Sequence, residues 1–264
     1  MTATILDRVR AGIPLTDIGI VDMHCHVGRY SFAIPDLTAE GFVRAMDRTG
    51  VRVMVASHLQ CIGGDFSWGN RELLSIAREA PGRILGYMSL WPTSAAEVER
   101  ETRACFAHPE FVGIKLHNAN GFSYDDDALR PAYEAAAARR MPVLYHTWGQ
   151  AKEFDEIRAV SARYPELSLL LGHAGAGNEA AYFPMVRDCP NVYLELAMSA
   201  APRGLVKRLI DGAGVERVVW GSDVNFINLA HQIGKVAGAD LSEPDKSAIL
   251  AINGQRILDR VTPA

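Results

Sequence analysis

Short apolar runs alternate with amphipathic stretches along the whole chain of 264 residues, and this alternation is the feature that most limits its fold. The apolar runs are rich in β-branched and aliphatic residues, as is typical of buried parallel strands. They cover residues 18–23, 51–57, 84–90, 111–117, 142–146, 167–171, 192–196 and 218–220. The stretches between them have helical spacing and cover residues 39–49, 71–79, 94–106, 127–140, 153–164, 179–188, 203–211 and 228–237.

Eight strands that alternate with eight helices predict a (β/α)8 TIM barrel, an α/β fold in which a single domain spans residues 1–264. An open doubly wound sheet is the structural alternative. We expect a short helix over residues 2–9 before the first strand and an extra helix over residues 242–260 at the C-terminus. The apolar residues of that extra helix are expected to pack on the exterior of the barrel: Ile249, Ile252, Ile257 and Leu258.

The composition argues against several classes of partner. The formal net charge is −4 and the isoelectric point is about 6.1, so the chain has no basic footprint for nucleic acid or for a membrane surface. No apolar stretch reaches about 18 residues, and the first residues lack the order of a signal peptide. The four cysteines are scattered, as in reduced proteins. We therefore expect a cytoplasmic protein with a small-molecule substrate; a homodimer is left open.

Two histidines, His24 and His26, lie at the end of the first predicted strand. Alternate residues of a strand point to the same face, so the two imidazoles project side by side and could bind one divalent cation. Two polar residues at a strand end would give the same pattern, so this pair alone does not decide between the two interpretations. Cys25 between them points to the opposite face and is expected to pack outward.

Further metal-binding residue types lie at the carboxyl ends of later strands, where the chemistry of a barrel is located. Six of the eight histidines lie at such ends, and only His108 and His231 fall in or beside helices. This clustering favours a metal site. The strand-end residues that we expect to bind the metal are His24, His26, Lys115, His146, His173 and Asp223.

Several other polar or aromatic residues follow the strands and are candidates for substrate contact. These are His58, His117, Trp91 and Trp148. Glu195 near the end of the seventh strand either orients a ligand from behind or pairs with a neighbour, and the sequence does not separate the two roles. Arg29 and Arg203 are basic loop residues that could bind a carboxylate, although arginines in loops are more often solvated.

The ordered set of motifs resembles the amidohydrolase superfamily, and in particular the amidohydrolase-related (amidohydrolase 2) family, which includes aminocarboxymuconate-semialdehyde decarboxylase. The match covers nearly the whole chain. It rests on the strand-one HxH pair and on five later segments: Gly-Ile-Lys-Leu-His at 113–117, Pro-Val-Leu-Tyr-His-Thr at 142–147, Leu-Gly-His-Ala-Gly at 171–175, Gly-Ser-Asp at 221–223 and Asn-Gly-Gln-Arg-Ile-Leu at 253–258.

The resemblance implies a metal-dependent enzyme with a divalent cation, usually zinc, held by His24, His26, His146 and Asp223. It implies that His173 is a ligand or a catalytic base and that Asp223 carries a proton during catalysis. Lys115 occupies the place of a lysine that is carboxylated and bridges two metals in binuclear relatives. One ion is favoured and two are left open.

Three functions remain open at this stage. The first is a hydrolase that uses a metal-activated water on an amide, lactone or ester bond, and it is our main expectation. The second is a lyase that decarboxylates or hydrates an unsaturated carboxylic acid. The third, a barrel without catalytic activity, is disfavoured because every expected ligand position is filled. A TatD-type nuclease is disfavoured by Lys115 and by the acidic net charge.

Overall fold

The computed structural model describes residues 3–34 and 36–263. Eight parallel strands form one sheet in which each strand lies beside its neighbours in the chain. The strands are β1 (Ile20–Val27), β2 (Val51–His58), β3 (Ile84–Ser89), β4 (Phe111–Leu116), β5 (Pro142–His146), β6 (Ser168–Gly172), β7 (Val192–Glu195) and β8 (Val218–Val219). The fold is the predicted barrel, and not the alternative of an open doubly wound sheet.

The barrel closes where β1 meets the segment that follows β8. The backbone N–H of Met23 donates to the carbonyl of Trp220 over 3.0 Å, and that of Asp223 donates to the carbonyl of His24 over 2.7 Å. These hydrogen bonds join the first strand to the segment that follows the last strand. They also place the residues after β8 directly against the HxH pair.

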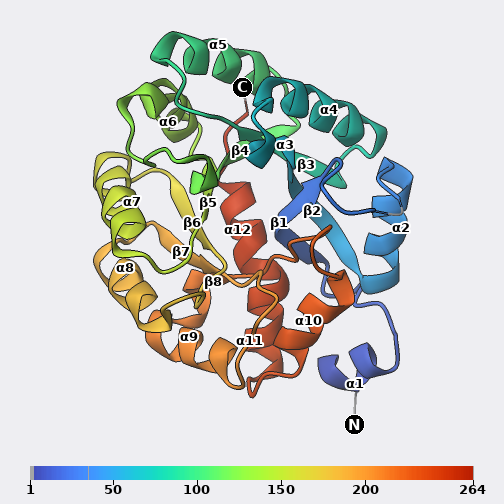
Figure 1. Ribbon diagram of the computed structural model, residues 1–264. Helices are drawn as coiled ribbons and strands as arrows, with labels where there is room; N and C mark the ends of the chain where they lie inside the picture. Colours follow the sequence, from blue (N-terminus) through green and yellow to red (C-terminus); the bar gives the residue numbers. More distant parts are fainter. Residues whose placement is uncertain (1–2, 35, 264) are drawn as a thin grey trace.

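Helices form a ring around the strands (Figure 1). The helices that alternate with strands are α2 (Ala39–Thr49), α4 (Phe66–Glu79), α5 (Ala95–Phe106), α6 (Arg130–Ala138), α7 (Ala151–Arg163), α8 (Tyr182–Asp188), α9 (Leu205–Ala213) and α10 (Leu229–Ala237). The remaining helices are α1 (Ile5–Arg10), α3 (Gln60–Gly63), α11 (Glu243–Ser247) and α12 (Asn253–Asp259), with a π-helical segment at Ala248–Ile252 between the last two and 3-10 turns at Asn118–Asn120, Asp127–Leu129, Glu179–Ala181 and Val215–Arg217. Within the described residues, no helix is long and apolar enough to span a membrane.

Local sequence explains the ends of these helices, as α2 illustrates. Thr38 caps its N-terminus by accepting a hydrogen bond from the N–H of Gly41. Gly50 ends it at a φ of 86°, where a side chain would be strained and a Cβ would lie 2.4 Å from the Leu15 backbone nitrogen. The predicted helix over 2–9 is observed as α1, and Thr2 lies outside the described residues.

Each strand contributes at least one side chain to an inner layer that fills the barrel, as a closed eight-stranded barrel requires. The layer consists of Val21, Met23, Val55, Tyr87, Val112, Leu144, Leu170, Tyr193 and Val219. A second, larger apolar cluster lies between the strands and the outer helices, and Cys25 is buried in it as predicted. The inner layer fills the barrel below the strand ends.

The C-terminal helix differs from its predicted position. Ile257 of α12 packs with the inner layer and Leu258 packs against it, whereas Ile252 is 57% exposed. A Cβ on Gly254 would lie 3.1 Å from the side chains of both Val21 and Met23, so α12 lies close against the start of β1. Only Ile249 is buried in the outer cluster as expected. Helix α12 therefore packs onto the barrel interior near the N-terminal ends of the strands, because helical spacing alone does not say which surface an apolar face will meet.

Candidate active site

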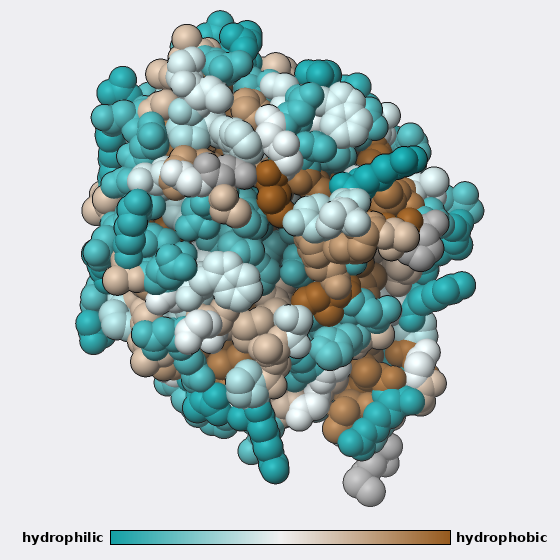
Figure 2. All heavy atoms as spheres, in the orientation of Figure 1, coloured by the Kyte–Doolittle hydropathy of each residue, from teal (hydrophilic) through white to brown (hydrophobic). Residues whose placement is uncertain are grey.

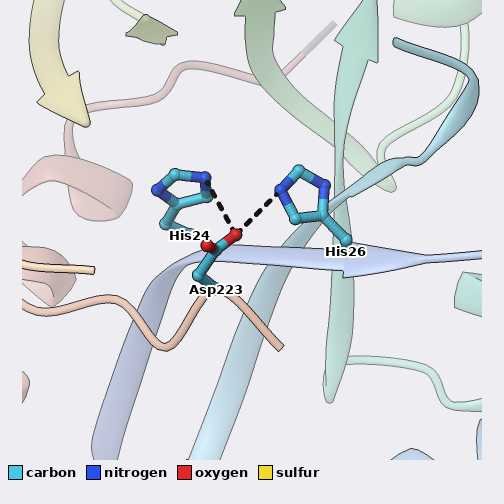
Figure 3. A group of neighbouring side chains, drawn as sticks. All are labelled: His24, His26 and Asp223. Carbon is cyan, nitrogen blue, oxygen red and sulfur yellow. Dashed lines mark ion pairs between the residues drawn. The ribbon is translucent and has the colours of Figure 1, made fainter. Parts of the chain in front are cut away.

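Three side chains converge at the carboxyl ends of β1 and β8: His24, His26 and Asp223. The Asp223 Oδ1 atom lies 3.2 Å from His26 Nε2 and 3.8 Å from His24 Nε2. Figure 3 shows both imidazoles directed at this carboxylate. One ligand atom from each residue lies within 4.8 Å of the other two, so a single cation could contact all three. We refer to these residues as the donor trio.

The chemistry of the donor trio fits a divalent metal. Two imidazole nitrogens and a carboxylate oxygen are ligands of zinc and related cations. Burial lowers the pKa of His26 and holds that of His24 well below its usual value, so both rings are neutral with a lone pair available. Although burial raises the pKa of Asp223, hydrogen bonding and charge from His26 outweigh this, and the net pKa is lowered.

A second hydrogen bond fixes each imidazole from behind. His24 Nδ1 lies 2.6 Å from Glu195 Oε2, and His26 Nδ1 lies 3.0 Å from the hydroxyl of Ser57. With Nδ1–H of His24 donating to the carboxylate, its Nε2 lone pair is left for a cation. Burial raises the pKa of Glu195 to about 8, so its carboxyl group can share the Nδ1 proton of His24. Of the two roles left open for Glu195, the geometry supports orientation of His24.

Asp22 holds the carboxyl end of β8 in register with β1. Its Oδ1 accepts from the N–H of Ser222 over 2.9 Å and from that of His24 over 3.1 Å, and its Oδ2 accepts from the Ser222 hydroxyl. Asp223, which follows Ser222, has a φ of 56°. This left-handed conformation costs a non-glycine residue about 1–3 kcal/mol. The Asp22–Ser222 contact therefore helps to keep Asp223 aimed at the two histidines.

Two glycines leave room for this arrangement. A Cβ on Gly221 would lie 2.3 Å from Glu195 Oε1 and 2.5 Å from His24 Cβ. A Cβ on Gly172 would lie 2.6 Å from the Tyr145 carbonyl oxygen and 3.3 Å from His24 Cε1. Because neither backbone nor buried site groups can move easily, both positions need glycine.

His146, His173 and His117 form a second group beside the donor trio. His146 Nδ1 lies 3.1 Å from His173 Nε2, while His173 Nδ1 bonds the carbonyl of Ala197. The rings of His117 and His146 stack with their centroids 3.8 Å apart, and the ring of His173 lies 4.9 Å from that of His24. His173 also has a left-handed φ, of 61°. The ligand roles of His146 and His173 stay predictions.

Lys115 is fully buried beneath the donor trio, with Nζ 2.9 Å from His24 Nε2. No ion pair among the described residues includes it, and burial lowers its pKa. Its amine therefore points at the same space as the predicted ligands. Carboxylation of Lys115, and with it a second metal ion, stays a prediction.

The donor trio opens into a cavity of about 280 Å³ at the C-terminal face of the barrel. In the space-filling view, hydrophobic side chains gather along part of the hollow in the middle of the face shown (Figure 2). The residues that line the cavity are His26, Tyr30, Ile62, His117, Ala119, His146, Trp148, His173, Met198, Ser199, Asp223 and Phe226. The predicted substrate contacts His117 and Trp148 are among them.

His58 and Trp91 are not among the described residues that line this cavity, and their contact with substrate stays a prediction. Ser57 faces His26, so the next residue, His58, points outward and packs edge-on against Trp68, with ring centroids 5.1 Å apart. Trp91 donates its indole N–H to the carbonyl of Cys61 in helix α3.

Sequence reasoning did not find the lining residues Tyr30, Ile62, Ala119, Met198, Ser199 and Phe226. A signal was present for two of them, since Tyr30 and Phe226 follow the predicted ligands His26 and Asp223 by four and three residues. Loops that follow the strands of a barrel border its active site.

Comparison with characterised proteins places these features in a family. A family model described as amidohydrolase matches residues 21–260. The chain is 23% identical, over a 283-residue alignment, to a gamma-resorcylate decarboxylase from Polaromonas sp. strain JS666, covering 81% of this chain and 85% of that protein. It is 26% identical over 188 residues to an L-fucono-1,5-lactonase from Burkholderia ambifaria, covering 62% of this chain and 63% of that protein.

Solved structures share the fold at low sequence identity. A 5-carboxyvanillate decarboxylase from Novosphingobium aromaticivorans, complexed with manganese and 4-hydroxy-3-methoxy-5-nitrobenzoic acid, superposes with a TM-score of 0.74 at 14% identity and covers 93% of this chain and 98% of that one. A dihydroxybenzoic acid decarboxylase from Polaromonas sp. JS666, with bound manganese and 2-nitroresorcinol, gives 0.71 at 17% identity, covering 91% and 97%. With the family model matching most of its length, this chain belongs to the amidohydrolase family.

Proposed function

We propose that this protein is a metal-dependent lyase that decarboxylates a small carboxylic acid. The observation that carries the proposal is the donor trio, His24, His26 and Asp223, at the base of a cavity on the C-terminal face of a barrel. That face holds the active site in characterised barrel enzymes. The family resemblance assigns these three residues, together with His146, to a divalent metal.

The relatives favour decarboxylation over hydrolysis, which was our first expectation from the sequence. The decarboxylase from Polaromonas aligns over 85% of its length, and the lactonase over 63%. The two superposed structures described above are also named as decarboxylases. Because the lactonase is nevertheless similar at 26% identity, hydrolysis of a lactone is kept as the second candidate function.

Decarboxylation requires a proton on the carbon that loses carbon dioxide: R–COO⁻ + H⁺ gives R–H + CO₂. A divalent cation bound by the donor trio would supply fixed positive charge for the substrate carboxylate. Asp223 is the one carboxylate among the described lining residues, and we assign it the transferred proton. Burial lowers the pKa of His173 to about 4, so its ring is neutral and, with Nδ1 bonded to Ala197, Nε2 faces the site as an acceptor.

We propose one divalent ion per chain, with Lys115 as an uncarboxylated amine. The donor trio is the one cluster of potential ligands found in the described part of the chain. Zinc was expected from the resemblance, whereas the two solved relatives described above carry manganese. Both ions belong in the first loading experiments.

The test follows isotopes from solvent into product. Zinc- and manganese-loaded protein is incubated in D₂O with 2,6-dihydroxybenzoate and with 5-carboxyvanillate, and in H₂¹⁸O with L-fucono-1,5-lactone. We expect released CO₂ and one deuterium on the ring carbon that carried the carboxylate. Opening of the lactone with ¹⁸O in the acid, and no CO₂ from either benzoate, would overturn the decarboxylase assignment in favour of hydrolysis.

A matched pair of variants ties the result to the site. His24→Ala removes a member of the donor trio, whereas His231→Ala removes an exposed histidine on α10. Activity of either kind should vanish in the first variant and persist in the second. Equal activity in the two variants would place the reaction elsewhere.

A further inference from the structure

A short buried segment without regular secondary structure joins β7 to the cavity. It consists of Leu196, Ala197 and Met198, whose exposed fractions are 4%, 0% and 7%. Glu195, just before the segment, holds His24, and Met198 at its end lines the cavity. The position of this segment therefore affects the donor trio and the space for substrate together.

The carbonyl oxygens of the segment accept hydrogen bonds from side chains of other elements. Buried carbonyls outside helices and sheets need such donors, because water does not reach them. The Lys235 amine donates to the carbonyl of Leu196 over 2.8 Å and to that of Met198 over 2.7 Å. The carbonyl between them, that of Ala197, accepts from Nδ1 of His173. Consecutive carbonyls thus point alternately toward Lys235 and toward the site.

Helix α10 holds Lys235 in a fixed place. Gln232 lies one turn before Lys235 on the same face of the helix, and its Nε2 also donates to the Met198 carbonyl, over 3.1 Å. The indole N–H of Trp220, which follows β8, donates to the backbone carbonyl of Gln232 over 3.2 Å. Because α10 is joined to the barrel in this way, the Lys235 amine meets the segment from a firm support.

Lys235 is half-buried and largely charged at neutral pH. Burial lowers its pKa to about 8, while the carboxylates of Glu195 and Asp223 act in the opposite direction. An ammonium group has three N–H donors, so it can serve both carbonyls at once. Lys235 also borders a hollow of about 620 Å³ beside α9 and α10, which Arg203 lines as well. This hollow gives room to a substituted side chain.

The Ala197 carbonyl decides which nitrogen of His173 carries the proton. A carbonyl only accepts, so Nδ1 of His173 is the donor and its Nε2 keeps the lone pair assigned to it above. If this carbonyl turned away, the proton could move to Nε2, and the ring could no longer accept a hydrogen bond there. The orientation of one peptide group thus controls what His173 can do in the site.

We propose that Lys235 is a positioning residue for the reaction. Its ammonium draws the carbonyls of Leu196 and Met198 toward α10, which keeps the Ala197 carbonyl turned to His173 and the proton of that ring on Nδ1. The inference rests on the proposed function and adds to the same site a residue that is not among the described residues lining the cavity.

The ring nitrogens of His173 report this effect directly. Zinc-loaded protein labelled with ¹⁵N-histidine is studied by long-range ¹H–¹⁵N correlation, and the His173 signals are assigned by their loss in His173→Gln. We expect the Nδ1–H form in the wild type and a population of the Nε2–H form in Lys235→Met, which removes the ammonium and keeps an unbranched side chain. Identical His173 signals in the two proteins would overturn the proposal.

Lys207→Met is the matched control. Lys207 lies on α9, lines the same hollow and pairs with Asp211 four residues later. Its removal should leave the His173 signals unchanged. Lys235→Gln, which keeps a donor and loses the charge, takes the place of Lys235→Met in every measurement if that variant does not fold.

Steady-state kinetics with the benzoates of the isotope experiment distinguishes positioning from a packing role. Lys235→Met should lower kcat about 10- to 100-fold, with KM changed less than about 3-fold and metal content unchanged, as for other groups that orient residues of a metal site. Lys235→Arg keeps the charge and several N–H donors and should recover part of the lost kcat. A wild-type kcat in Lys235→Met, or no recovery in Lys235→Arg, would contradict the assigned role.

The outcomes separate this inference from the proposed function. If the His173 signals change in Lys235→Met and the wild type releases no CO₂ from either benzoate, the positioning role stands and the reaction fails. If the wild type releases CO₂ and Lys235→Met does so equally fast with unchanged His173 signals, the positioning role fails and the reaction stands.

Discussion

The base of the cavity and its entrance are built in different ways. The donor trio at the base lies at strand ends, has exposed fractions of 0%, 3% and 9%, and is held by Glu195, Ser57 and Asp22 through hydrogen bonds. The entrance consists of Tyr30, Trp148 and Phe226, which stand on loops, are 36–48% exposed and are held by contacts between rings.

This difference separates the chemistry from the choice of substrate. Groups locked by hydrogen bonds on strands keep a fixed geometry, as metal binding and proton transfer require. Loop residues with large exposed faces can be exchanged without disturbing the barrel. Changes at the base should therefore affect metal binding and turnover, and changes at the entrance should affect ligand affinity.

The largest effect is expected from removing an imidazole of the donor trio. His26→Ala should lower kcat/KM on the order of 1,000-fold or more, because the fixed charge for the substrate carboxylate is lost with the metal. Turnover and bound metal are measured on the same preparation. His108→Ala, which removes a histidine outside the site, is the control, and a normal metal content in His26→Ala would contradict the assignment.

An intermediate effect is expected from Glu195→Gln, which keeps the size of the side chain and removes the carboxyl group that shares the Nδ1 proton of His24. Loss of the carboxylate behind His24 should weaken metal affinity about 10- to 100-fold, as for other groups that orient metal-binding histidines. Competition with a chromophoric chelator measures the affinity. Glu166→Gln, at an exposed position, is the matched control. Unchanged affinity in Glu195→Gln would reduce Glu195 to a packing role.

The smallest effect is expected at the entrance. Phe226→Ala removes one edge-to-face partner of Tyr30 and should raise KM about 3- to 10-fold, with kcat and metal content changed less than about 2-fold. Steady-state kinetics separates the two parameters. A fall in kcat without a change in KM would contradict the assignment of turnover to the base and of ligand affinity to the entrance.

The sequence predicted the base of the site better than its entrance, for a physical reason. A strand alternates its faces, so the shared direction of His24 and His26 follows from their spacing, and the barrel brings Asp223 to them once β8 closes on β1. The same alternation, applied to Ser57 and His58, would have shown that His58 points outward. Loops have no such periodicity, so the sequence could not show that Trp148 lines the cavity and that Trp91 does not.

Contacts between distant segments were the other limit. Glu195 and His24 are 171 residues apart in the chain, and no local sequence pattern predicts their contact. Ile257 and Ile252 both looked apolar and helical, yet one packs with the inner layer and the other is exposed. Which surface a helical face meets depends on where the whole helix lies.

Metal stoichiometry tests the central claim most directly. Protein stripped with a chelator and reloaded with manganese or zinc should retain about one ion per chain, and the triple variant His24→Ala/His26→Ala/Asp223→Asn should retain none. A value near two would contradict the single ion and favour a carboxylated, bridging Lys115. Full retention of metal by the triple variant would contradict the site itself.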